Sequence, residues 1–267
     1  MAGPGPRPEP VLDPIWVSMR RDARDWLERE PALAGLLHGA VLDRADFEEA
    51  LGCLLAIRLE GPGVDRLLLS RMFDQAVRGD PWIVEASRAD ISATHDRDPA
   101  CTSYLEPFIL FKGYQALQAH RIANSLWHSG RRIMACYLQS RASAVFGVDI
   151  HPAARIGKGI MIDHATGVVI GETAVIGEGV SLLHGVTLGG TGKERGDRHP
   201  KIGAGTMIGA NASILGNISI GCCCKIGAGS VVLTDVPDNT TYAGVPAREV
   251  GTIGGEDWPA LSMNQEF

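Results

Sequence analysis

His164 and two nearby carboxylates are the residues in this chain best suited to move a proton. His164 lies in the segment DHATG directly after Asp163, and Asp149 lies fifteen residues earlier in VDIHPAA. An imidazole with an ordinary pKa near ~6.5 can accept a proton near neutral pH, and a carboxylate can orient its tautomer. The pattern predicts a general base, although an exposed polar turn would carry the same residues.

A second polar group, Arg198 and His199, lies in the segment GDRHP. A planar guanidinium can grip a carboxylate through two parallel hydrogen bonds, and an imidazole can donate another. These residue types suit the binding of a substrate carboxylate. The alternative interpretation is a solvated basic loop on the protein surface.

The residues that carry these groups lie within a repeat of six. A helix repeats near 3.6 residues and a strand near two, whereas a period of six with frequent glycines is typical of a parallel β-helix built from hexapeptides. Each hexapeptide would form a short strand and a turn, with the aliphatic or small residue pointing inward. The thirteen inward positions are Ile150, Ile156, Ile162, Val168, Ala174, Val180, Val186, Ile202, Ile208, Ile214, Ile220, Ile226 and Val232.

This period is interrupted between Val186 and Ile202, where sixteen residues replace six. The pattern predicts a single insertion of ten residues, about Gly192 to Lys201, that leaves the coil as a loop. A loop expelled from a rigid solenoid usually carries function. Arg198 and His199 lie in it.

The N-terminal half has helical periodicity. Residues 1–10 contain four prolines and two glycines and are expected to be disordered. Asp13 followed by Pro14 suits a helix N-cap, and roughly seven helices are expected, from residue 13 and then at about 31–41, 44–60, 64–78, 81–92, 105–128 and 130–145. We therefore divide the chain into a tail at 1–10, an α-helical domain at 11–147, a β-helix domain at 148–253 and a flexible tail at 254–267.

Composition restricts the class of protein. The 267 residues are 45% hydrophobic with a formal net charge of −6, which argues against nucleic acid as the main partner. No apolar run approaches the ~20 residues needed to span a bilayer, and the N-terminus has no apolar signal segment, so no membrane association and a cytoplasmic location are expected. The six cysteines show no disulfide or CxxC spacing and are expected to be reduced thiols.

Three longer segments strengthen these expectations: VDIHPAARIGKGIMIDHATGVVIGETAVIG, HGVTLGGTGKERGDRHPKIG and AGVPAR. Together with the preceding helical region they resemble serine O-acetyltransferases, members of the left-handed β-helix acyltransferases, over about residues 13 to 253. The resemblance implies an α+β fold in which an N-terminal all-α domain precedes a C-terminal left-handed parallel β-helix with one expelled loop. It also implies transfer of an acetyl group from acetyl-CoA to the hydroxyl of L-serine, the first step of cysteine biosynthesis.

The resemblance assigns roles to the polar residues. His164 is expected to be the general base of a direct transfer, with Asp149 as the second member of a catalytic dyad. Asp98, in a polar loop expected at 94–107, and Asp163 are expected to contact the amino group of serine. Arg198 and His199 are expected in the serine site, where His199 reaches His164 of a neighbouring subunit.

Acetyl-CoA needs backbone donors and a few cations along a groove. By resemblance the segment GGTGK borders this site, while the small residues of later coils complete the groove through their backbone. Arg248 is a further phosphate candidate, although an exposed C-terminal arginine is more often only solvated. The expected contributors are Gly189, Gly190, Lys193, Ala210, Ala228 and Arg248.

The family also suggests partners. A homotrimer, paired through the helical regions into a hexamer, and feedback inhibition by cysteine are expected. Relatives that bind O-acetylserine sulfhydrylase end in Ile, whereas this sequence ends in Phe267, so weak or no binding of that enzyme is expected. No metal is required for the reaction.

Other functions remain open from the sequence. A hexapeptide acyltransferase could act on a sugar or an antibiotic, and a β-helix could serve as a trimeric scaffold. A metallohydratase would bind zinc through His164, His184 and His199 of adjoining subunits; however, His164 and His184 are twenty residues apart, and a coil of eighteen would not stack them. A covalent acyl-thiol route through Cys222 to Cys224 is disfavoured because only Lys225 is at hand to stabilise a thiolate. His120 is expected to pack within a helix.

Overall fold

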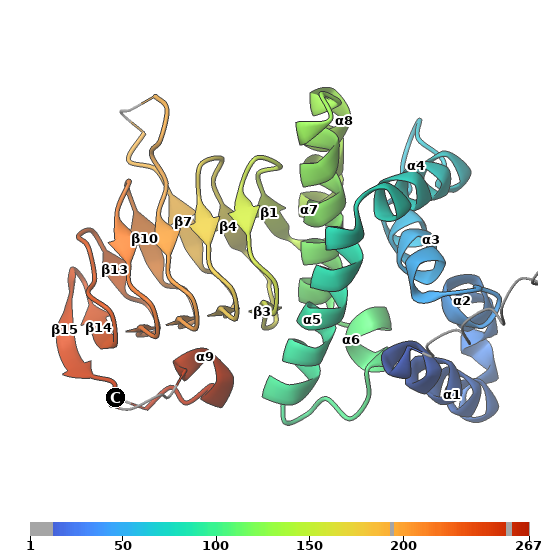
Figure 1. The fold of residues 1–267 in the computed structure, drawn as a ribbon, viewed down its shortest axis with the longest axis horizontal. Helices are drawn as coiled ribbons and strands as arrows, with labels where there is room; N and C mark the ends of the chain where they lie inside the picture. Colours follow the sequence, from blue (N-terminus) through green and yellow to red (C-terminus); the bar gives the residue numbers. More distant parts are fainter. Residues whose placement is uncertain (1–12, 193–194, 255–257, 267) are drawn as a thin grey trace, which may run out of the picture.

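The computed structural model describes residues 13–192, 195–254 and 258–266. Helices form one region, and a stack of coils forms the other (Figure 1). Helices α5, α7 and α8 lie against the first coil, so the helical region closes one end of the stack. The expected disorder of residues 1–10 falls outside the described residues.

The helical elements follow the expected order, with two differences in extent. Asp13 caps the first helix by accepting hydrogen bonds from the backbone N–H groups of Ile15 and Trp16, as the Asp-Pro pair predicts. The elements are α1 (Pro14–Arg29), η1 (Pro31–Leu33), α2 (Ala34–Leu37), η2 (His38–Leu42), α3 (Phe47–Leu59), α4 (Arg66–Gly79), α5 (Pro81–Arg97), α6 (Leu105–Ile109), α7 (Lys112–His128) and α8 (Arg132–Phe146).

The prediction of a single helix at 105–128 is wrong. The chain breaks between α6 and α7, where Phe111 has an extended conformation. The Gln115 side chain satisfies the freed backbone by donating to the carbonyls of Phe108 and Ile109 at 2.9 and 2.8 Å. Helix α5 is also longer than expected and includes Asp96 and Arg97, so the polar loop begins only at Asp98.

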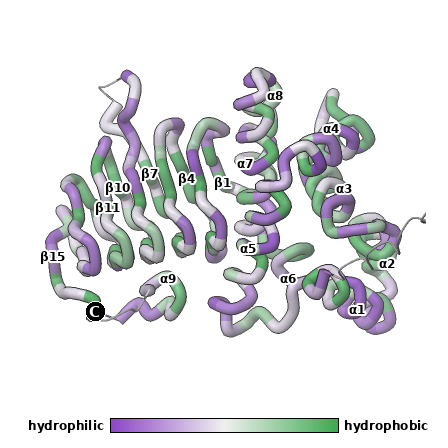
Figure 2. The backbone as a smooth tube through the Cα atoms, viewed as in Figure 1, coloured by the Kyte–Doolittle hydropathy of each residue, from purple (hydrophilic) through white to green (hydrophobic). Residues whose placement is uncertain are grey.

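The second region is a parallel β-helix whose strands form three sheets, in the orders β1-β4-β7-β10-β13, β11-β8-β5-β2 and β15-β14-β12-β9-β6-β3. All thirteen expected inward residues are buried, and hydrophobic and hydrophilic residues alternate along the coils (Figure 2). The strands are β1 (Val148–Ile150), β2 (Arg155–Ile156), β3 (Met161–Ile162), β4 (Val168–Ile170), β5 (Val175–Ile176), β6 (Ser181–Leu182), β7 (Thr187–Gly189), β8 (Lys201–Ile202), β9 (Met207–Ile208), β10 (Ser213–Leu215), β11 (Ser219–Ile220), β12 (Lys225–Ile226), β13 (Val231–Val232), β14 (Thr240–Gly244) and β15 (Ala247–Thr252).

The coils differ in length at two places, which corrects the expected single insertion. Between β3 and β4 the first coil has two more residues than the paired stretch between β6 and β7. Between β7 and β8 the chain has eight more residues than the paired stretch between β4 and β5. The ten extra residues are thus divided between the DHATG turn and the expelled loop.

The reason for this error lies in the strands themselves. A strand such as β4 buries two residues, Val168 and Ile170, at 0% and 1% exposure. A period of six can be followed through either of them. The sequence pattern moved from one inward position to the other at Val168, and this shift hid the two-residue insertion.

The C-terminal segment also differs from the expected flexible tail at 254–267. Helix α9 (Pro259–Ser262) packs on the coils: Ala260 donates its N–H to the Gly205 carbonyl at 3.2 Å, and its carbonyl accepts a hydrogen bond from Ser181 at 2.8 Å. Gly205 has a φ of +69°, and a Cβ there would lie 2.9 Å from the Trp258 ring. Pro259 and Ala260 are buried, so this part of the C-terminal segment packs on the coils.

A buried ion pair joins the helices to the first coil. Asp90 of α5 accepts hydrogen bonds from Arg121 and from the backbone N–H of Ile160, both at 2.9 Å. Arg121 of α7 in turn donates to the carbonyls of Ile156 and Gly157 at 3.2 and 2.7 Å. The side chains of Asp90 and Arg121 are 0% and 4% exposed, so each charge depends on the other.

Removing one partner should therefore destabilise the protein strongly. Arg121→Ala leaves the Asp90 carboxylate buried without its countercharge, and burial already raises the pKa of Asp90. We expect a loss of about 3–5 kcal/mol in the free energy of unfolding, measured by urea denaturation at fixed protein concentration.

The matched control is Arg78→Ala, which breaks the ion pairs with Asp74 at 2.7 Å and with Asp46 at 3.6 Å, where all three side chains are nearly half exposed. An exposed pair contributes at most about 1 kcal/mol. Equal losses for the two variants would show that the Asp90–Arg121 pair does not hold the two regions together.

Candidate active site

The DHATG turn holds His164 outside the coil. Its two extra residues allow a left-handed backbone at His164 and Ala165, with φ of 54° and 60°. Such angles are uncommon for residues other than glycine and occur often at functional sites. The His164 side chain is 77% exposed, so its ring nitrogens are accessible to a substrate.

The turn is supported from the helical side. Gly113 of α7 approaches so closely that a Cβ there would lie 2.0 Å from the Ile162 carbonyl oxygen. Only glycine allows this contact. Lys112, the preceding residue, hydrogen-bonds to Thr166 in the turn.

His164 and His184 do lie one above the other on successive coils, contrary to the expectation from a coil of eighteen residues. The first coil pairs with the second at a separation of twenty, so that Ile162 lies beside Leu182 and the two histidines lie one above the other. Their ring centroids are 6.1 Å apart with an interplanar angle of 76°. The expectation failed because the two-residue insertion lengthens this coil.

The same corner continues into the expected acetyl-CoA site. Leu182 pairs with Ile208, and Ile208 with Ile226, so Ala210 and Ala228 occupy the positions that follow His184 on the next two coils. The backbone N–H of Gly229 donates to the Ala210 carbonyl at 2.7 Å. The column His164, His184, Ala210, Ala228 thus joins the expected base to a track of small residues.

The carboxylates near His164 are placed differently from one another. Asp163 has a carboxylate oxygen 3.8 Å from His164 Nε2. Asp149 on β1 instead accepts a hydrogen bond from Gln139 of α8 at 2.7 Å. Among the described residues of one chain, no hydrogen bond joins Asp149 to His164.

His199 lies in a second site at another corner of the coils. Its ring is 7% exposed and lies over Gly171, where a Cβ would be 2.0 Å from the ring. Thr173 contacts His199 Nδ1 through its backbone N–H at 3.2 Å and its hydroxyl at 2.9 Å. Burial and the charge of Arg198 lower the pKa of His199, so the ring is neutral at pH 7.

Arg198 pairs with Glu172 across a 2.7 Å contact. Its hydrogen bond lowers the pKa of Glu172, which is therefore ionised. A cavity of about 300 Å³ beside this pair is lined by Ala153, Arg155, Glu172, Thr173, Ala174 and Asp197. Sequence reasoning missed Glu172, Thr173 and Gln139, although the first two lie in the quoted segment that also contains DHATG.

The other expected site residues are spread along the chain. Asp98 is the C-cap of α5 and accepts a hydrogen bond from the Ala100 N–H at 2.8 Å; in the described part of the chain no hydrogen bond joins it to a site histidine. Gly189 ends β7, and Gly190 begins the expelled loop against the Arg198 backbone. Arg248 on β15 is exposed, and Lys193 lies outside the described residues.

Cysteine thiols, metal-binding groups and membrane-spanning helices are three other features that could indicate a different function. Burial raises the pKa values of Cys223 and Cys224, which argues against a thiolate nucleophile. Within the described ranges, no group of three or more His, Cys, Asp or Glu residues is arranged to hold a metal ion. No helix there is long and apolar enough to cross a bilayer.

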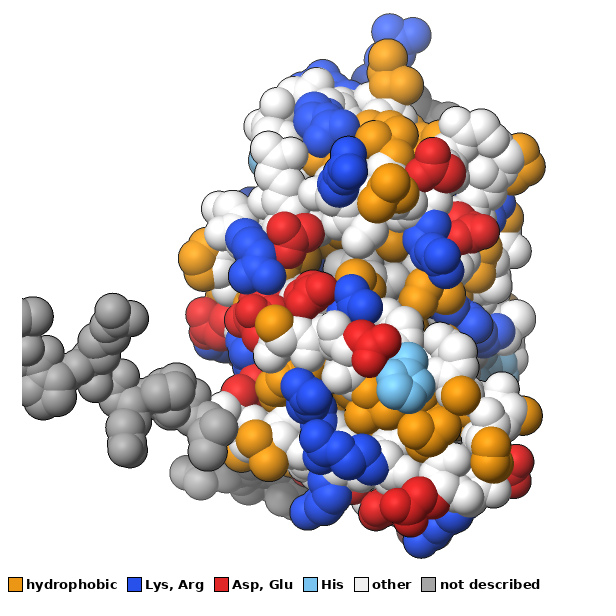
Figure 3. All heavy atoms as spheres, turned by 90° about the vertical axis from the view of Figure 1, so that its right-hand side faces the viewer, with side chains coloured by type: hydrophobic (Ala, Val, Ile, Leu, Met, Phe, Trp, Pro, Cys, Tyr) orange, Lys and Arg blue, Asp and Glu red, His pale blue; other side chains and the backbone are white. Residues whose placement is uncertain are grey.

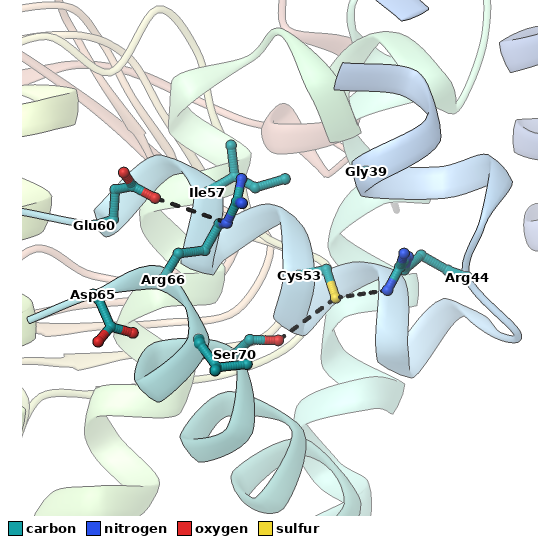
Figure 4. A pocket seen from close by; sticks show the side chains of 9 residues that line it. Gly39, Arg44, Cys53, Ile57, Glu60, Asp65, Arg66 and Ser70 are labelled. Atoms are coloured by element: carbon teal, nitrogen blue, oxygen red, sulfur yellow. Dashed lines mark hydrogen bonds and ion pairs between the residues drawn. The ribbon is translucent and has the colours of Figure 1, made fainter. Parts of the chain in front are cut away.

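A separate cavity lies in the helical region, with a volume of about 620 Å³ (Figure 4). It is lined by Arg44, Cys53 and Ser70 among others, and Cys53 Sγ lies 3.5 Å from Arg44 Nη1. None of the expected site residues lines this cavity. The outer end of the helical region carries interspersed positive and negative side chains (Figure 3).

The hexapeptide coils, the exposed histidine at a coil corner and the adjoining column of small residues define an acyltransferase of the hexapeptide-repeat class. Residues 199–234 match the family profile described as bacterial transferase hexapeptide (six repeats), and residues 15–119 match serine acetyltransferase, N-terminal.

Individual relatives narrow this class. Serine acetyltransferase 2 from Arabidopsis thaliana is 52% identical over 97% of this chain and 80% of its own length. The crystal structure of serine acetyltransferase in complex with coenzyme A from Brucella abortus is 51% identical, with a TM-score of 0.89 over 91% of this chain and 97% of that one. A serine acetyltransferase in complex with cysteine is 48% identical, with a TM-score of 0.92 over 95% and 98%.

The chain belongs to the serine acetyltransferase family, and it is an acyltransferase with the left-handed β-helix of that family. The α+β fold class and the membership of the serine acetyltransferase family, both expected from the sequence motifs, are thereby confirmed.

Proposed function

We propose that this protein transfers the acetyl group of acetyl-CoA to the hydroxyl of L-serine, giving O-acetylserine and CoA. The observation that carries the proposal is an exposed His164 in a column with Ala210 and Ala228, within a chain that shares about half its residues with named serine acetyltransferases. The solved relative with coenzyme A supports acetyl-CoA as the second substrate.

The transfer is direct. His164 takes the proton of the serine hydroxyl as its oxygen attacks the thioester carbonyl carbon. The tetrahedral intermediate then collapses, the carbon–sulfur bond breaks, and the imidazolium returns the proton to the departing CoA sulfur. No acyl-enzyme forms, in keeping with the raised pKa values of the Cys223 and Cys224 thiols.

The other polar residues bind and orient. Arg198 and His199 hold the serine carboxylate, and Asp98 with Asp163 holds its amino group. Asp149 orients His164, while Gly189, Gly190, Lys193, Ala210, Ala228 and Arg248 border acetyl-CoA. Cysteine shares the amino and carboxylate groups of serine and so competes for the same site, a proposal supported by the relative solved with cysteine.

The site is shared between subunits of a trimer. His164 and His199 lie at different corners of the coils, and among the described residues no hydrogen bond joins them within one chain. His199 of one chain meets His164 of its neighbour. Three further expectations stay predictions: the pairing of trimers into a hexamer, the weak binding of O-acetylserine sulfhydrylase, and a cytoplasmic location. Phe267, on which the second depends, lies outside the described residues.

The proposed acceptor is tested by measuring CoA release with L-serine and with a panel of other hydroxyl compounds, including a sugar and an aminoglycoside. We expect turnover with serine to exceed that with the sugar and the aminoglycoside by at least about 100-fold, because neither offers a carboxylate and an amino group together beside the hydroxyl. Faster turnover with a sugar would contradict the proposal.

The proposed base is tested by His164→Ala. We expect kcat to fall by about 10²- to 10⁴-fold with an unchanged unfolding midpoint, because an exposed imidazole acts on the proton and fills no core. Asp149→Ala should have a smaller effect in the same direction. A His164→Ala enzyme with more than about a tenth of normal activity would remove this residue from the base role.

The shared site is tested by mixing. His164→Ala and His199→Ala proteins should each be impaired, but refolding them together should form mixed trimers in which an intact His164 faces an intact His199. Activity should then rise above that of either parent. Mixed trimers, verified by native mass spectrometry, whose activity stays at the parental average would instead place each site within one chain.

A further inference from the structure

The hydroxyl of Thr173 lies against the backbone and the ring of His199, and its hydrogen bonds restrict where its proton can point. Its hydroxyl oxygen accepts from the backbone N–H groups of Arg198 and His199 at 3.0 and 3.1 Å. These bonds occupy both lone pairs of the oxygen. The hydroxyl proton can then be donated to His199 Nδ1, at 2.9 Å, or to the carboxylate of Asp197, whose pKa the Thr173 hydroxyl helps to lower.

A second donor points at the same nitrogen. The backbone N–H of Thr173 lies 3.2 Å from His199 Nδ1, and a backbone amide can only donate. A proton on Nδ1 would face this N–H group at close range. The neutral ring consequently carries its proton on Nε2, and burial together with the nearby Arg198 opposes a second proton.

The other ring nitrogen is available. Among the described residues, no hydrogen-bond partner of His199 Nε2 is found, and this nitrogen lies where a Cβ on Gly171 would be only 2.1 Å away. The His199 ring thus lies over Gly171 and is hydrogen-bonded to Thr173 through Nδ1. What it offers to a ligand is one N–H donor in a fixed direction.

We propose that Thr173 is a positioning residue that holds His199 as the neutral Nε2–H tautomer, so that His199 supplies a hydrogen-bond donor, and not a base, to the site. The identity of the acceptor, the carboxylate of serine, rests on the proposed function. The tautomer itself does not. The two histidines of the site would thereby have different roles, because His164 is exposed and, in the described part of the chain, no hydrogen-bond donor is found at its ring nitrogens.

The tautomer is tested directly by the ring ¹⁵N signals of histidine-labelled protein, with the His199 signals assigned by their loss in His199→Ala. We expect the wild-type ring to show an unprotonated Nδ1 and a protonated Nε2 at pH 7. Thr173→Val should move these signals towards a mixture of tautomers. A protonated Nδ1 in the wild type would overturn the proposal.

The positioning role is tested by a double-mutant cycle. Thr173→Val should lower kcat/KM for serine by about 10- to 100-fold, since a displacement of about 1 Å in a site can cost that much, with little change in KM for acetyl-CoA. In a His199→Ala background the same change should lower kcat/KM further by less than about threefold. A full additional loss in that background would show that Thr173 acts through the general fold.

Two controls separate this role from a loss of folding. Thr173→Ser keeps the hydroxyl and should retain activity within about threefold of the wild type. Thr206→Val removes a similar hydroxyl, which donates to the Gly221 carbonyl and accepts from the Cys224 N–H but contacts no histidine, and it should leave kcat/KM for serine unchanged. If the wild type fails to acetylate serine yet shows the Nε2–H ring, the proposed function fails while the tautomer stands.

Discussion

Parallel pairing between successive coils is the constraint on which the site depends. Each strand can form its ladder only in one register, because a slip by one residue would turn inward side chains outward. Extra residues must therefore leave at corners. The two insertions in this chain do so at different corners, after β3 and after β7, and each places one of the two site histidines.

The two insertions create different surroundings for the same side chain. His164 stands on a two-residue bulge, exposed to solvent, and its neighbours are the His184 ring and Asp163. His199 is drawn under its loop against Gly171 and Thr173, where burial lowers its pKa. An exposed imidazole can gain and lose a proton during turnover, whereas a buried one with its Nδ1 occupied keeps a constant donor. The division of labour follows from coil geometry.

The β-helix could be predicted from the period of six because its inward residues are aliphatic at nearly every coil. The exact register could not, since Val168 and Ile170 are both buried and either satisfies the period. That ambiguity concealed the stacking of His164 on His184. The helical region was predictable where caps such as Asp13 are local, and less so at Phe111, where the Gln115 side chain compensates for the break. Glu172 and Thr173 carry no signature of their own, because their role arises only when the loop folds back.

The Arg198–Glu172 pair sets a further condition on substrate binding. At 2.7 Å the guanidinium already has a carboxylate partner, and Glu172 is ionised because this contact lowers its pKa. If Arg198 binds the serine carboxylate as proposed, that carboxylate must share Arg198 with Glu172 or displace it. Sharing is feasible because a guanidinium has five N–H donors, and among the described residues Nη1 donates to the Gly196 carbonyl at 3.0 Å and to no other acceptor. Glu172 then keeps the side chain oriented before the substrate arrives, while repulsion between the two carboxylates limits how tightly any amino acid is held.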